Sequence, residues 1–406
     1  MGWLSLLERR RDANPAPQSP RDAPLRPGAG GVEICQVTTR RQLSQFVKLP
    51  QRIYANDPHW VPRLMIEVKE FLDPKRHPFY AHGAAAQFLA VRRGEPAGRI
   101  LVSDDPTYNE FHAANLGCFG MFESVDDQAV ASALLDAAAR WLKDRGRTAI
   151  MGPIDYSMNY SCGLLVEGFD TPPRIMMNHN PPYYARLLEQ WGLEKAKDLL
   201  AWWFDDSQDV CARWNRMAEW LGRRGGVKLR AFRMNDFEAE VKRCNAVYSA
   251  ATARNWGFVK LSDAEFQHLA RQMARITVPE HVLLAEVDGM PVGFSITLPD
   301  LNEAIRPLGG RLTIFGLPIG LVRLLFRIRK IKTARMMVLD VIEGYRRRGV
   351  GELLILRTLD YGKRTLGYTG AELSWTLEDN TAVTRTIEAV GARPYKRYRI
   401  YERFLA

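Results

Sequence analysis

The two halves of this chain repeat the same order of predicted elements, and this repeat constrains the fold more than any single motif does. Each half begins with two short apolar segments joined by a turn, a pattern that predicts a β-hairpin. The paired segments are 87–91 with 96–102 and, in the second half, 282–287 with 291–296, where Asp288 and Gly289 form the turn. Asp-Gly is a preferred pair in two-residue hairpin turns.

After its hairpin, each half continues with a strand, a helix, and later a helix that follows an asparagine and ends at a glycine. These features lie at 117–122, 127–145 and 180–192 in the first half, and at 336–341, 351–364 and 380–391 in the second. A chain of 406 residues is long enough for two domains of ordinary size. The sequence therefore predicts two tandem domains of the α/β (α+β) class, each with a mixed central sheet flanked by helices.

The chain is basic, with 57 Lys and Arg against 46 Asp and Glu and a formal charge of +11. This excess favours an acidic partner, such as a phosphorylated ligand, nucleic acid or an anionic membrane surface. No helix-turn-helix or RNA-binding signature occurs, so no nucleic-acid partner is expected. Five scattered cysteines without a Cys-x-x-Cys pair argue against a disulfide scaffold and a zinc module and suit a reducing cytoplasm.

The N-terminal region predicts neither a folded domain nor a targeting signal. Its first seven residues are apolar over too short a run for a secretory signal, and arginines follow that run instead of preceding it. Residues 12–31 are rich in Pro, Arg, Ala and Gly without periodicity, which predicts a disordered tail. No apolar run is long enough to span a bilayer.

A basic turn joins the predicted strand at 336–341 to the predicted helix that follows it. Backbone N–H groups at a helix start lack intrahelical partners, and the aligned peptide dipoles place partial positive charge there. Gly349 and Gly351 allow the backbone to approach an anion closely, and three arginines add formal charge. The turn therefore predicts a pyrophosphate site, with a solvated basic turn as the alternative.

The order Arg346-x-x-Gly349-x-Gly351 after a Val-rich strand resembles the acyl-CoA-binding signature of the GNAT acyltransferase superfamily. The likeness extends from Met336 to the C-terminus, where Asn380 and Gly391 flank the last helix as they do in that family. The resemblance implies a GNAT-like fold for both halves. It also implies an acyl-CoA site formed by Val341, Arg346, Arg347, Arg348, Gly349, Val350, Gly351 and Asn380.

The first half differs from the second where the phosphates would bind. At the position of the basic turn it carries Glu123, Asp126 and Asp127, which would repel phosphate. We therefore expect a degenerate copy and one acyl-CoA site per chain. Its segments 152–160 and 176–184 are expected to be irregular connections, with substrate recognition as the alternative.

These patterns predict four regions. They are a disordered tail at 1–31, a degenerate GNAT-like domain at 32–206, a helical linker at 207–228, and an acyltransferase domain at 229–406 with an amphipathic insertion at about 306–334. The linker prediction rests on a helical pattern at 210–223 that is followed by Arg224, Gly225 and Gly226.

Acyl transfer from a thioester to an amine needs a base for the amine, donors for the oxyanion and a proton for the thiolate. The resemblance implies that backbone amides of a bulged strand meet the acyl carbonyl, and by position these belong to 339–343. Asp340 is the first candidate for the base, because a charge within an apolar strand is costly unless it is paired or functional. Glu343 is the second candidate.

The general acid is less clear from the sequence. The family often carries a tyrosine on the last helix, and Ile387 stands at that position. Tyr398 is the candidate substitute, in a segment that also contains Tyr395 and Tyr401. Glu378 and Asp379 are expected to cap the helix that follows them.

The insertion contains a predicted amphipathic helix after Pro318. Arg323, Arg327 and Lys330 fall on one face, while Leu321, Leu325 and Ile328 fall on another. Such a segment can lie in the headgroup layer of an anionic membrane, or it can pack on the protein with its basic face in water.

Three further motifs, at 168–173, 180–184 and 255–258, resemble a group of bacterial two-domain GNAT proteins that includes bacterial ceramide synthases. The resemblance implies an N-acyltransferase that moves a long-chain fatty acyl group from acyl-CoA to a primary amine, with a sphingoid base as the candidate acceptor and no metal. The alternatives are acetyl or aminoacyl transfer to a soluble amine or peptide, and a CoA-binding module without activity. The expected partners are acyl-CoA, a lipid amine and an anionic membrane surface. The expected location is the cytoplasm, at the periphery of the inner membrane.

Overall fold

The structure is a computed structural model that describes residues 31–205, 209–224, 226–310, 312 and 317–405. The tail predicted at 1–31 lies outside the described residues, apart from Gly31, and so does a part of the insertion predicted at 306–334.

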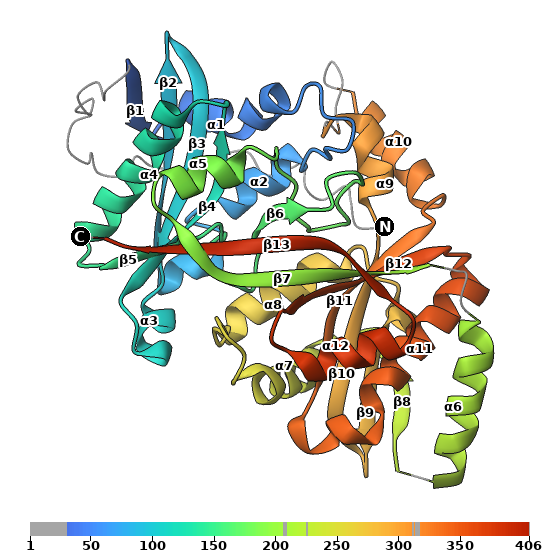
Figure 1. The fold of residues 1–406 in the computed structure, drawn as a ribbon. Helices are drawn as coiled ribbons and strands as arrows, with labels where there is room; N and C mark the ends of the chain where they lie inside the picture. The colour runs from blue at the N-terminus through green and yellow to red at the C-terminus, as the bar shows by residue number, and fades with distance from the viewer. Residues whose placement is uncertain (1–30, 206–208, 225, 311, 313–316, 406) are drawn as a thin grey trace, which may run out of the picture.

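Within the described residues the strands form one 13-stranded mixed sheet that extends through both halves (Figure 1). The strands are β1 (Val32–Gln36), β2 (Ala84–Arg92), β3 (Glu95–Asp104), β4 (Leu116–Ser124), β5 (Ala149–Gly152), β6 (Leu164–Glu167), β7 (Glu194–Asp205), β8 (Lys228–Ala231), β9 (Val282–Val287), β10 (Met290–Pro299), β11 (Thr333–Val341), β12 (Gly370–Leu377) and β13 (Arg393–Phe404). Their spatial order is β1-β2-β3-β4-β5-β13-β7-β12-β11-β10-β9-β8, and β6 pairs with β13 beside this path. The predicted mixed sheets are thus present, and they are joined.

In the first half, helices cover both faces of the sheet. Residues along a strand alternate between faces, so the neighbours Leu101 and Val102 of β3 enter different core clusters. On the Val102 side lie α4 (Gln128–Lys143) and α5 (Tyr184–Gln190), and on the Leu101 side lie α1 (Arg40–Ile53) and α2 (Met65–Phe71).

The second half has the same three layers. Leu284 of β9 packs with α7 (Phe237–Thr252), while its neighbours Leu283 and Ala285 pack with α11 (Val350–Tyr361) on the opposite face. The other helices of this half are α6 (Val210–Arg224), α8 (Asp263–Ala274), α9 (Asn302–Ile305), α10 (Ile319–Ile328) and α12 (Thr381–Ala389), and α3 (Pro106–His112) belongs to the first half. A 3₁₀ turn at Glu343–Arg348 and a π-helical turn at Gly362–Leu366 flank α11.

Both predicted hairpins are confirmed, and their turns share one geometry. Arg93 and Gly94 join β2 to β3 with φ of 53° and 79°, and Asp288 and Gly289 join β9 to β10 with φ of 49° and 77°. Positive φ at both central residues matches the twist of the flanking strands. The repeat read from the sequence is therefore a repeat of structure.

The last strand of each half is inserted between strands of the other half. β13, at the end of the second half, pairs with β5 of the first half, and β7, at the end of the first half, pairs with β12 of the second half. β7 and β13 also pair with each other along most of their length. The predicted domain limits stay predictions. The sheet continues across the limit that was predicted after residue 206.

Helix α10 lies in the predicted insertion, and it packs one face on the protein. The structure buries Leu324, which is 7% exposed, and packs Ile328 against the same core cluster, whereas Leu325 is 52% exposed. Leu324 and Ile328 are four residues apart and so lie on one side of the helix. Of the predicted apolar face, Ile328 therefore packs on the protein, while Leu325 is exposed.

Candidate active site

The cavity of the second half forms where β11 and β12 separate. The two strands pair in parallel only from Thr333 to Met336 and from Gly370 to Leu373. Beyond these residues β11 continues beside β10 and β12 beside β7, and Met337 forms a bulge in β11. The gap between the strands opens into a cavity of about 550 Å³, which is within the usual range for small-molecule sites.

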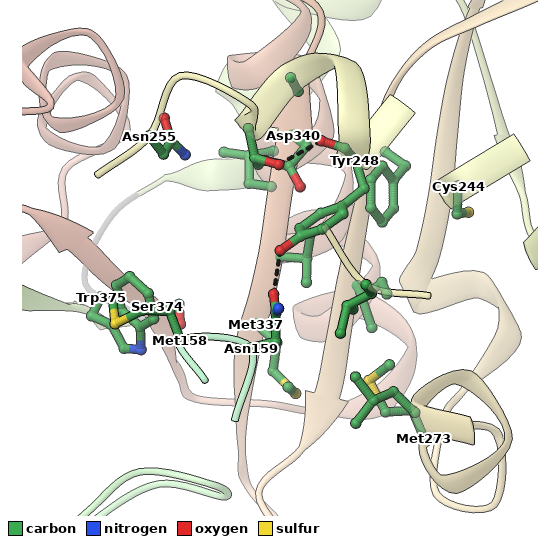
Figure 2. A pocket seen from close by; sticks show the side chains of 18 of the residues that line it. Met158, Asn159, Cys244, Tyr248, Asn255, Met273, Met337, Asp340, Ser374 and Trp375 are labelled. Atoms are coloured by element: carbon green, nitrogen blue, oxygen red, sulfur yellow. Dashed lines mark hydrogen bonds between the residues drawn. The ribbon is translucent and has the colours of Figure 1, made fainter. Parts of the chain in front are cut away.

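Four parts of the chain line this cavity (Figure 2). They are the diverging ends of β11 and β12, helices α7 and α8 with their flanking loops, the turn before α11 together with the start of α12, and two loops of the first half at 158–162 and 176–178. The first-half segments that were expected to be plain connections therefore form one wall of the site. The motif at 255–258 also lines it.

Asp340 is the one acidic side chain among the described residues that line the cavity. It is partly buried near the end of β11, and no hydrogen bond or ion pair joins its carboxylate to another described residue. Loss of water around the carboxylate raises its pKa to about 7, and the positive charge of Arg346 opposes this rise. A carboxyl group with a pKa near neutrality can exchange a proton at physiological pH.

The other predicted acid and base residues lie outside the cavity. Glu343 is exposed and pairs with Arg254 at 3.0 Å, and Tyr398 of β13 is completely buried in a core cluster on one face of the sheet. Glu378 and Asp379 accept hydrogen bonds from Lys195 at 2.7 Å and Lys197 at 2.9 Å. The prediction that these two residues cap α12 is wrong, because Asn380 is the cap and accepts from the Val383 N–H.

The start of α11 has the properties that an anion site requires. Gly349 precedes the helix with φ of 73°, in the left-handed region that favours glycine, and no side chain caps the first turn. Its N–H groups therefore stay available for a ligand. Gly351 lies in the cavity wall, where a Cβ atom would come within 3.4 Å of Thr386 on α12. Val350 is completely buried in the core beneath this turn.

The three arginines of the turn differ in their contacts. Arg346 donates hydrogen bonds to the carbonyl oxygens of Val341 at 3.0 Å and Ala251 at 2.7 Å, so it ties the turn to β11 and α7. Arg347 is exposed and lines the cavity, and Arg348 is exposed with its guanidinium 4.9 Å from the ring centre of Tyr345. Of the predicted acyl-CoA residues, the cavity brings together Val341, Arg346, Arg347, Gly351 and Asn380.

The strand registers correct our comparison of the two halves. In the first half, Arg99 pairs with Glu123, and Gly98 pairs with the residue that follows Glu123. In the second half, Phe294 pairs with Asp340, and Gly293 pairs with the residue that follows Asp340. Glu123 is therefore the counterpart of Asp340 on the strand, not a residue of the turn.

In the first half, that carboxylate is satisfied by its own chain. Tyr54 and Tyr184 donate hydrogen bonds to Glu123 at 2.7 and 2.8 Å, and Arg99 lies 3.3 Å from it. Burial raises the pKa of the Glu123 carboxyl, and the Arg99 charge opposes this. Glu123 thus has the same strand position as Asp340 without a comparable open cavity around it.

The rest of the first-half site is also filled by the protein. Asp127 caps α4 and accepts from the N–H groups of Ala129 at 2.9 Å and Val130 at 3.4 Å. The carboxylate of Asp127 therefore occupies the start of that helix, where a phosphate would otherwise bind. Between β4 and β5, Ile154 donates to the Phe119 carbonyl at 2.6 Å and Asp155 accepts from the Met121 N–H at 2.9 Å. The expectation of one acyl-CoA site per chain stays a prediction, supported by this contrast.

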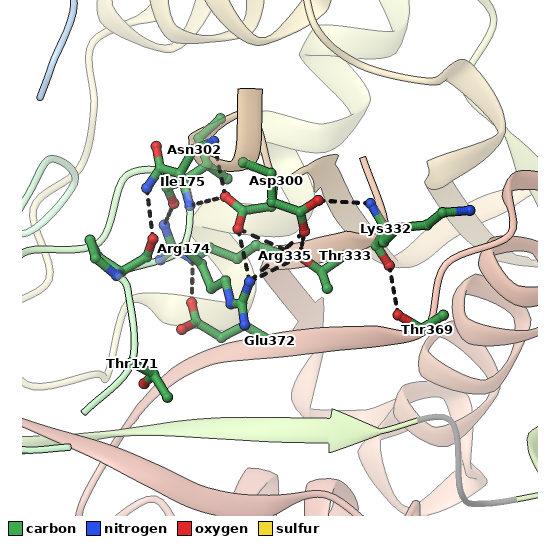
Figure 3. A network of polar contacts seen from close by, with 12 residues as sticks. Thr171, Arg174, Ile175, Asp300, Asn302, Lys332, Thr333, Arg335, Thr369 and Glu372 are labelled. Atoms are coloured by element: carbon green, nitrogen blue, oxygen red, sulfur yellow. Dashed lines mark hydrogen bonds and ion pairs between the residues drawn. The ribbon is translucent and has the colours of Figure 1, made fainter. Parts of the chain in front are cut away.

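A buried network of charges fixes the first-half loop against the diverging strands (Figure 3). Arg335 of β11 donates to the carbonyl of Ile175 at 2.6 Å and to the hydroxyl of Ser374 at 2.9 Å, and it lies 2.9 Å from Glu372. Arg174 pairs with Asp300 at 3.2 Å. Removing one partner of such a buried set leaves an uncompensated charge. The network therefore holds the two walls of the cavity together.

Sequence reasoning missed the contribution of α7 and α8, including Tyr248. A Ser262/Glu265 capping box marks the start of α8, but nothing local signals that the hydroxyl of Tyr248 reaches Asn159 of the first half. That contact joins residues 89 positions apart in the sequence.

Within the described residues, no helix combines the length and apolar character that crossing a bilayer requires. Among the same residues, no cluster of three or more His, Cys, Asp or Glu side chains is arranged to hold a metal ion.

The repeated plan of diverging parallel strands and a following helix defines a tandem GNAT fold. Solved structures with this fold match nearly the whole chain. A tandem GNAT protein from the clavulanic acid biosynthesis pathway matches with a TM-score of 0.56 at 15% identity, covering 92% of this chain and 99% of that one. A GCN5-related N-acetyltransferase from Sphaerobacter thermophilus matches with a TM-score of 0.52 at 13% identity, covering 93% and 96%.

Two curated proteins are similar in sequence over almost their full length. The bacterial ceramide synthase of Caulobacter vibrioides (strain NA1000 / CB15N) is 36% identical over 380 residues, covering 92% of this chain and 98% of that protein. Protein YghO of Escherichia coli (strain K12) is 34% identical over 372 residues, covering 90% and 93%. No protein-family model matches the chain. The chain belongs to the family of the bacterial ceramide synthase, and it has the tandem GNAT fold.

The turn before α11 can be tested by replacing its left-handed glycine. We expect Gly349→Val to weaken acyl-CoA binding at least about tenfold, because a β-branched residue at this φ costs on the order of 1–2 kcal/mol or displaces the turn. Isothermal titration calorimetry measures the affinity and the stoichiometry, which we expect to be one per chain.

Gly94→Val is the matched control. Gly94 also has positive φ, at 79°, and has open space around it, but it lies in the first-half hairpin. It should retain acyl-CoA affinity. Unchanged binding by Gly349→Val would contradict the assignment of this turn to the CoA phosphates.

Proposed function

We propose that this enzyme transfers a long-chain fatty acyl group from acyl-CoA to the primary amine of a lipid, with a sphingoid base as the acceptor class. The name of the Caulobacter relative supports this acceptor, because a ceramide is an N-acylated sphingoid base. The cavity supports the lipid character of the substrates, because much of its lining is apolar.

The observation that carries the proposal is an apolar arm of the cavity between α7, α8 and the sheet. Its lining side chains are Phe232, Phe237, Val241, Cys244, Phe266, Leu269, Met273, Phe294 and Ile296. Apolar lining stabilises a bound aliphatic chain by removing its surface from water, at about 25 cal/mol per Å². An acetyl group or a small soluble amine would leave most of this surface without a partner.

Asp340 is the proposed base at the junction of this arm with the CoA turn. It takes a proton from the ammonium group of the acceptor, and the free amine then attacks the thioester carbonyl. The attacking nitrogen loses a second proton and the carbon–sulfur bond breaks as the amide forms, and this proton is balanced by the one that the departing thiolate takes up. Asp340 must be ionised to act as the base, so its raised pKa makes activity depend on pH near neutrality.

Helix α10 is the proposed contact with an anionic membrane. Its exposed apolar side chains are Ile319, Val322, Leu325 and Phe326, with Leu317 just before the helix. Arg323, Arg327, Arg329 and Lys330 are exposed around them, and no acidic residue occurs between positions 304 and 339. Apolar insertion together with cationic residues near anionic headgroups is the usual basis of interfacial binding. Met273 packs against the same core cluster as Leu324 and also lines the cavity, so α10 and the apolar arm share one neighbour.

The function is tested with purified enzyme, acyl-CoA donors of increasing chain length and three acceptors: a sphingoid base, a short polar amine and a peptide. We expect amide formation with the sphingoid base and a higher kcat/KM for long-chain donors, measured by liquid chromatography and mass spectrometry. Preference for acetyl-CoA and a soluble acceptor would overturn the proposal in favour of small-molecule acylation.

The base is tested by the pH dependence of kcat/KM. For the wild type we expect kcat/KM to rise through an ionisation near pH 7, because only the deprotonated Asp340 accepts a proton. Asp340→Asn should lower kcat by about 10²–10⁴-fold and remove this limb of the profile. Glu343→Gln, which changes an exposed carboxylate outside the cavity, is the control. It should keep the wild-type kcat and the limb of the profile near pH 7. A limb near pH 7 that persists in Asp340→Asn would rule out this base.

Membrane contact is tested with a double variant, Leu325→Glu with Phe326→Glu. We expect it to lose most of its co-flotation with vesicles rich in anionic phospholipid, because two inserted side chains become charged. Binding of the wild type should also fall with added salt. Ile66→Glu, at a residue of α2 that is 65% exposed, is the control and should float as the wild type does. Equal flotation of the double variant would show that α10 is not the contact.

A further inference from the structure

A hydrogen bond between the two halves crosses the cavity beside Asp340. Tyr248 of α7 donates its hydroxyl hydrogen to Oδ1 of Asn159, which lies in the first-half loop after β5. Figure 2 shows Tyr248 between Asp340 and Asn159, and the charge of Asp340 is one cause of a raised pKa at Tyr248. All three residues line the cavity.

Tyr248, Asn159 and Asp340 can accept further hydrogen bonds, but the hydrogens of Tyr248 and Asn159 are already used. The Asn159 amide donates to the Val259 carbonyl at 3.1 Å and to the Ser157 hydroxyl at 3.4 Å, so its hydrogens are already used. The Tyr248 hydrogen is used on Asn159. Lone pairs on the Tyr248 oxygen and on Asn159 Oδ1 remain, together with the Asp340 carboxylate. The three residues therefore offer acceptors and no free donor when Asp340 is ionised.

The surroundings of these acceptors are aromatic and apolar. The rings of Phe258 and Phe266 lie with their centres 5.9 Å from that of Tyr248. Phe266 also belongs to the apolar arm. A ligand that fits here therefore has an aliphatic part and, next to it, a compact head that carries several hydrogen-bond donors.

We propose that Asp340, Tyr248 and Asn159 form a binding site for the head group of an amino alcohol, with the ammonium on Asp340 and a neighbouring hydroxyl donating to Tyr248 or Asn159. This rests on the proposed function and deepens it, because it assigns the choice of acceptor to a contact made by both halves. Tyr248 and Asn159 are specificity residues in this scheme, and the proton is transferred at Asp340.

The physical reason for selectivity is the cost of leaving the remaining lone pairs of part-buried oxygens without a hydrogen-bond donor. An alkylamine without the hydroxyl displaces water from the Tyr248 and Asn159 oxygens and gives them nothing in return. Sites built to bind a hydroxyl therefore discriminate strongly against the analogue that lacks it. An amino alcohol of the same chain length satisfies the same atoms.

The test compares two acceptors of equal chain length, a 1-aminoalkane and the corresponding 2-amino-1-alkanol, with one long-chain acyl-CoA. We expect the wild type to favour the amino alcohol in kcat/KM. Tyr248→Phe and Asn159→Ala should each reduce this preference at least about tenfold, mainly through KM for the amino alcohol. The double variant should lose little more than either single variant, because the two residues act as one unit.

Acyl-CoA affinity, measured by calorimetry, shows whether each variant is folded and should match the wild type. Tyr108→Phe is the control, since Tyr108 lies in the first half outside this cavity and should keep the preference. Equal losses for both acceptors, or an unchanged preference in both single variants, would overturn this inference alone. Absence of amide formation by the wild type with either acceptor would instead overturn the proposed function.

Discussion

The separation of β11 from β12 is the constraint on which the site depends. Two parallel strands that stop pairing after Met336 and Leu373 leave a gap in the sheet, and the cavity occupies it. The helix that follows β11 then begins at the edge of this gap, which places its uncapped N–H groups beside the cavity. A thioester whose phosphates lie on that turn would therefore extend between the strands, where Asp340 faces the cavity.

The exchange of β7 and β13 explains why the first half contributes to the site of the second. Each strand is held by pairing on both sides, so the halves cannot separate without breaking the centre of the sheet. Their fixed arrangement brings the loops at 158–162 and 176–178 onto the cavity. Arg335 holds the second loop through the Ile175 carbonyl, and Tyr248 holds the first through Asn159. The half without an open site thus becomes a wall of the functional one.

Glu123 and Asp340 show how the same strand position can have different surroundings in the two halves. Both are carboxylates at the same register, and burial raises the pKa of both. Arg99 and two tyrosine hydroxyls satisfy Glu123, so its charge is part of a packed core. Asp340 has no such partners among the described residues, and it faces a space that a substrate can enter. The two carboxylates differ in the residues that surround them, and these residues come from parts of the chain outside the two strands.

The sequence by itself determined the repeat, the hairpin turns, and the strand and helix around Gly349, because these depend on local periodicity and turn chemistry. It missed the strand exchange and the meeting of Tyr248 with Asn159. It also assigned Glu378 and Asp379 as the caps of α12, where Asn380 is the cap. Only the tertiary structure decided these points, because each depends on pairing and burial between residues that are distant in the chain, and such contacts leave no periodic trace in either partner.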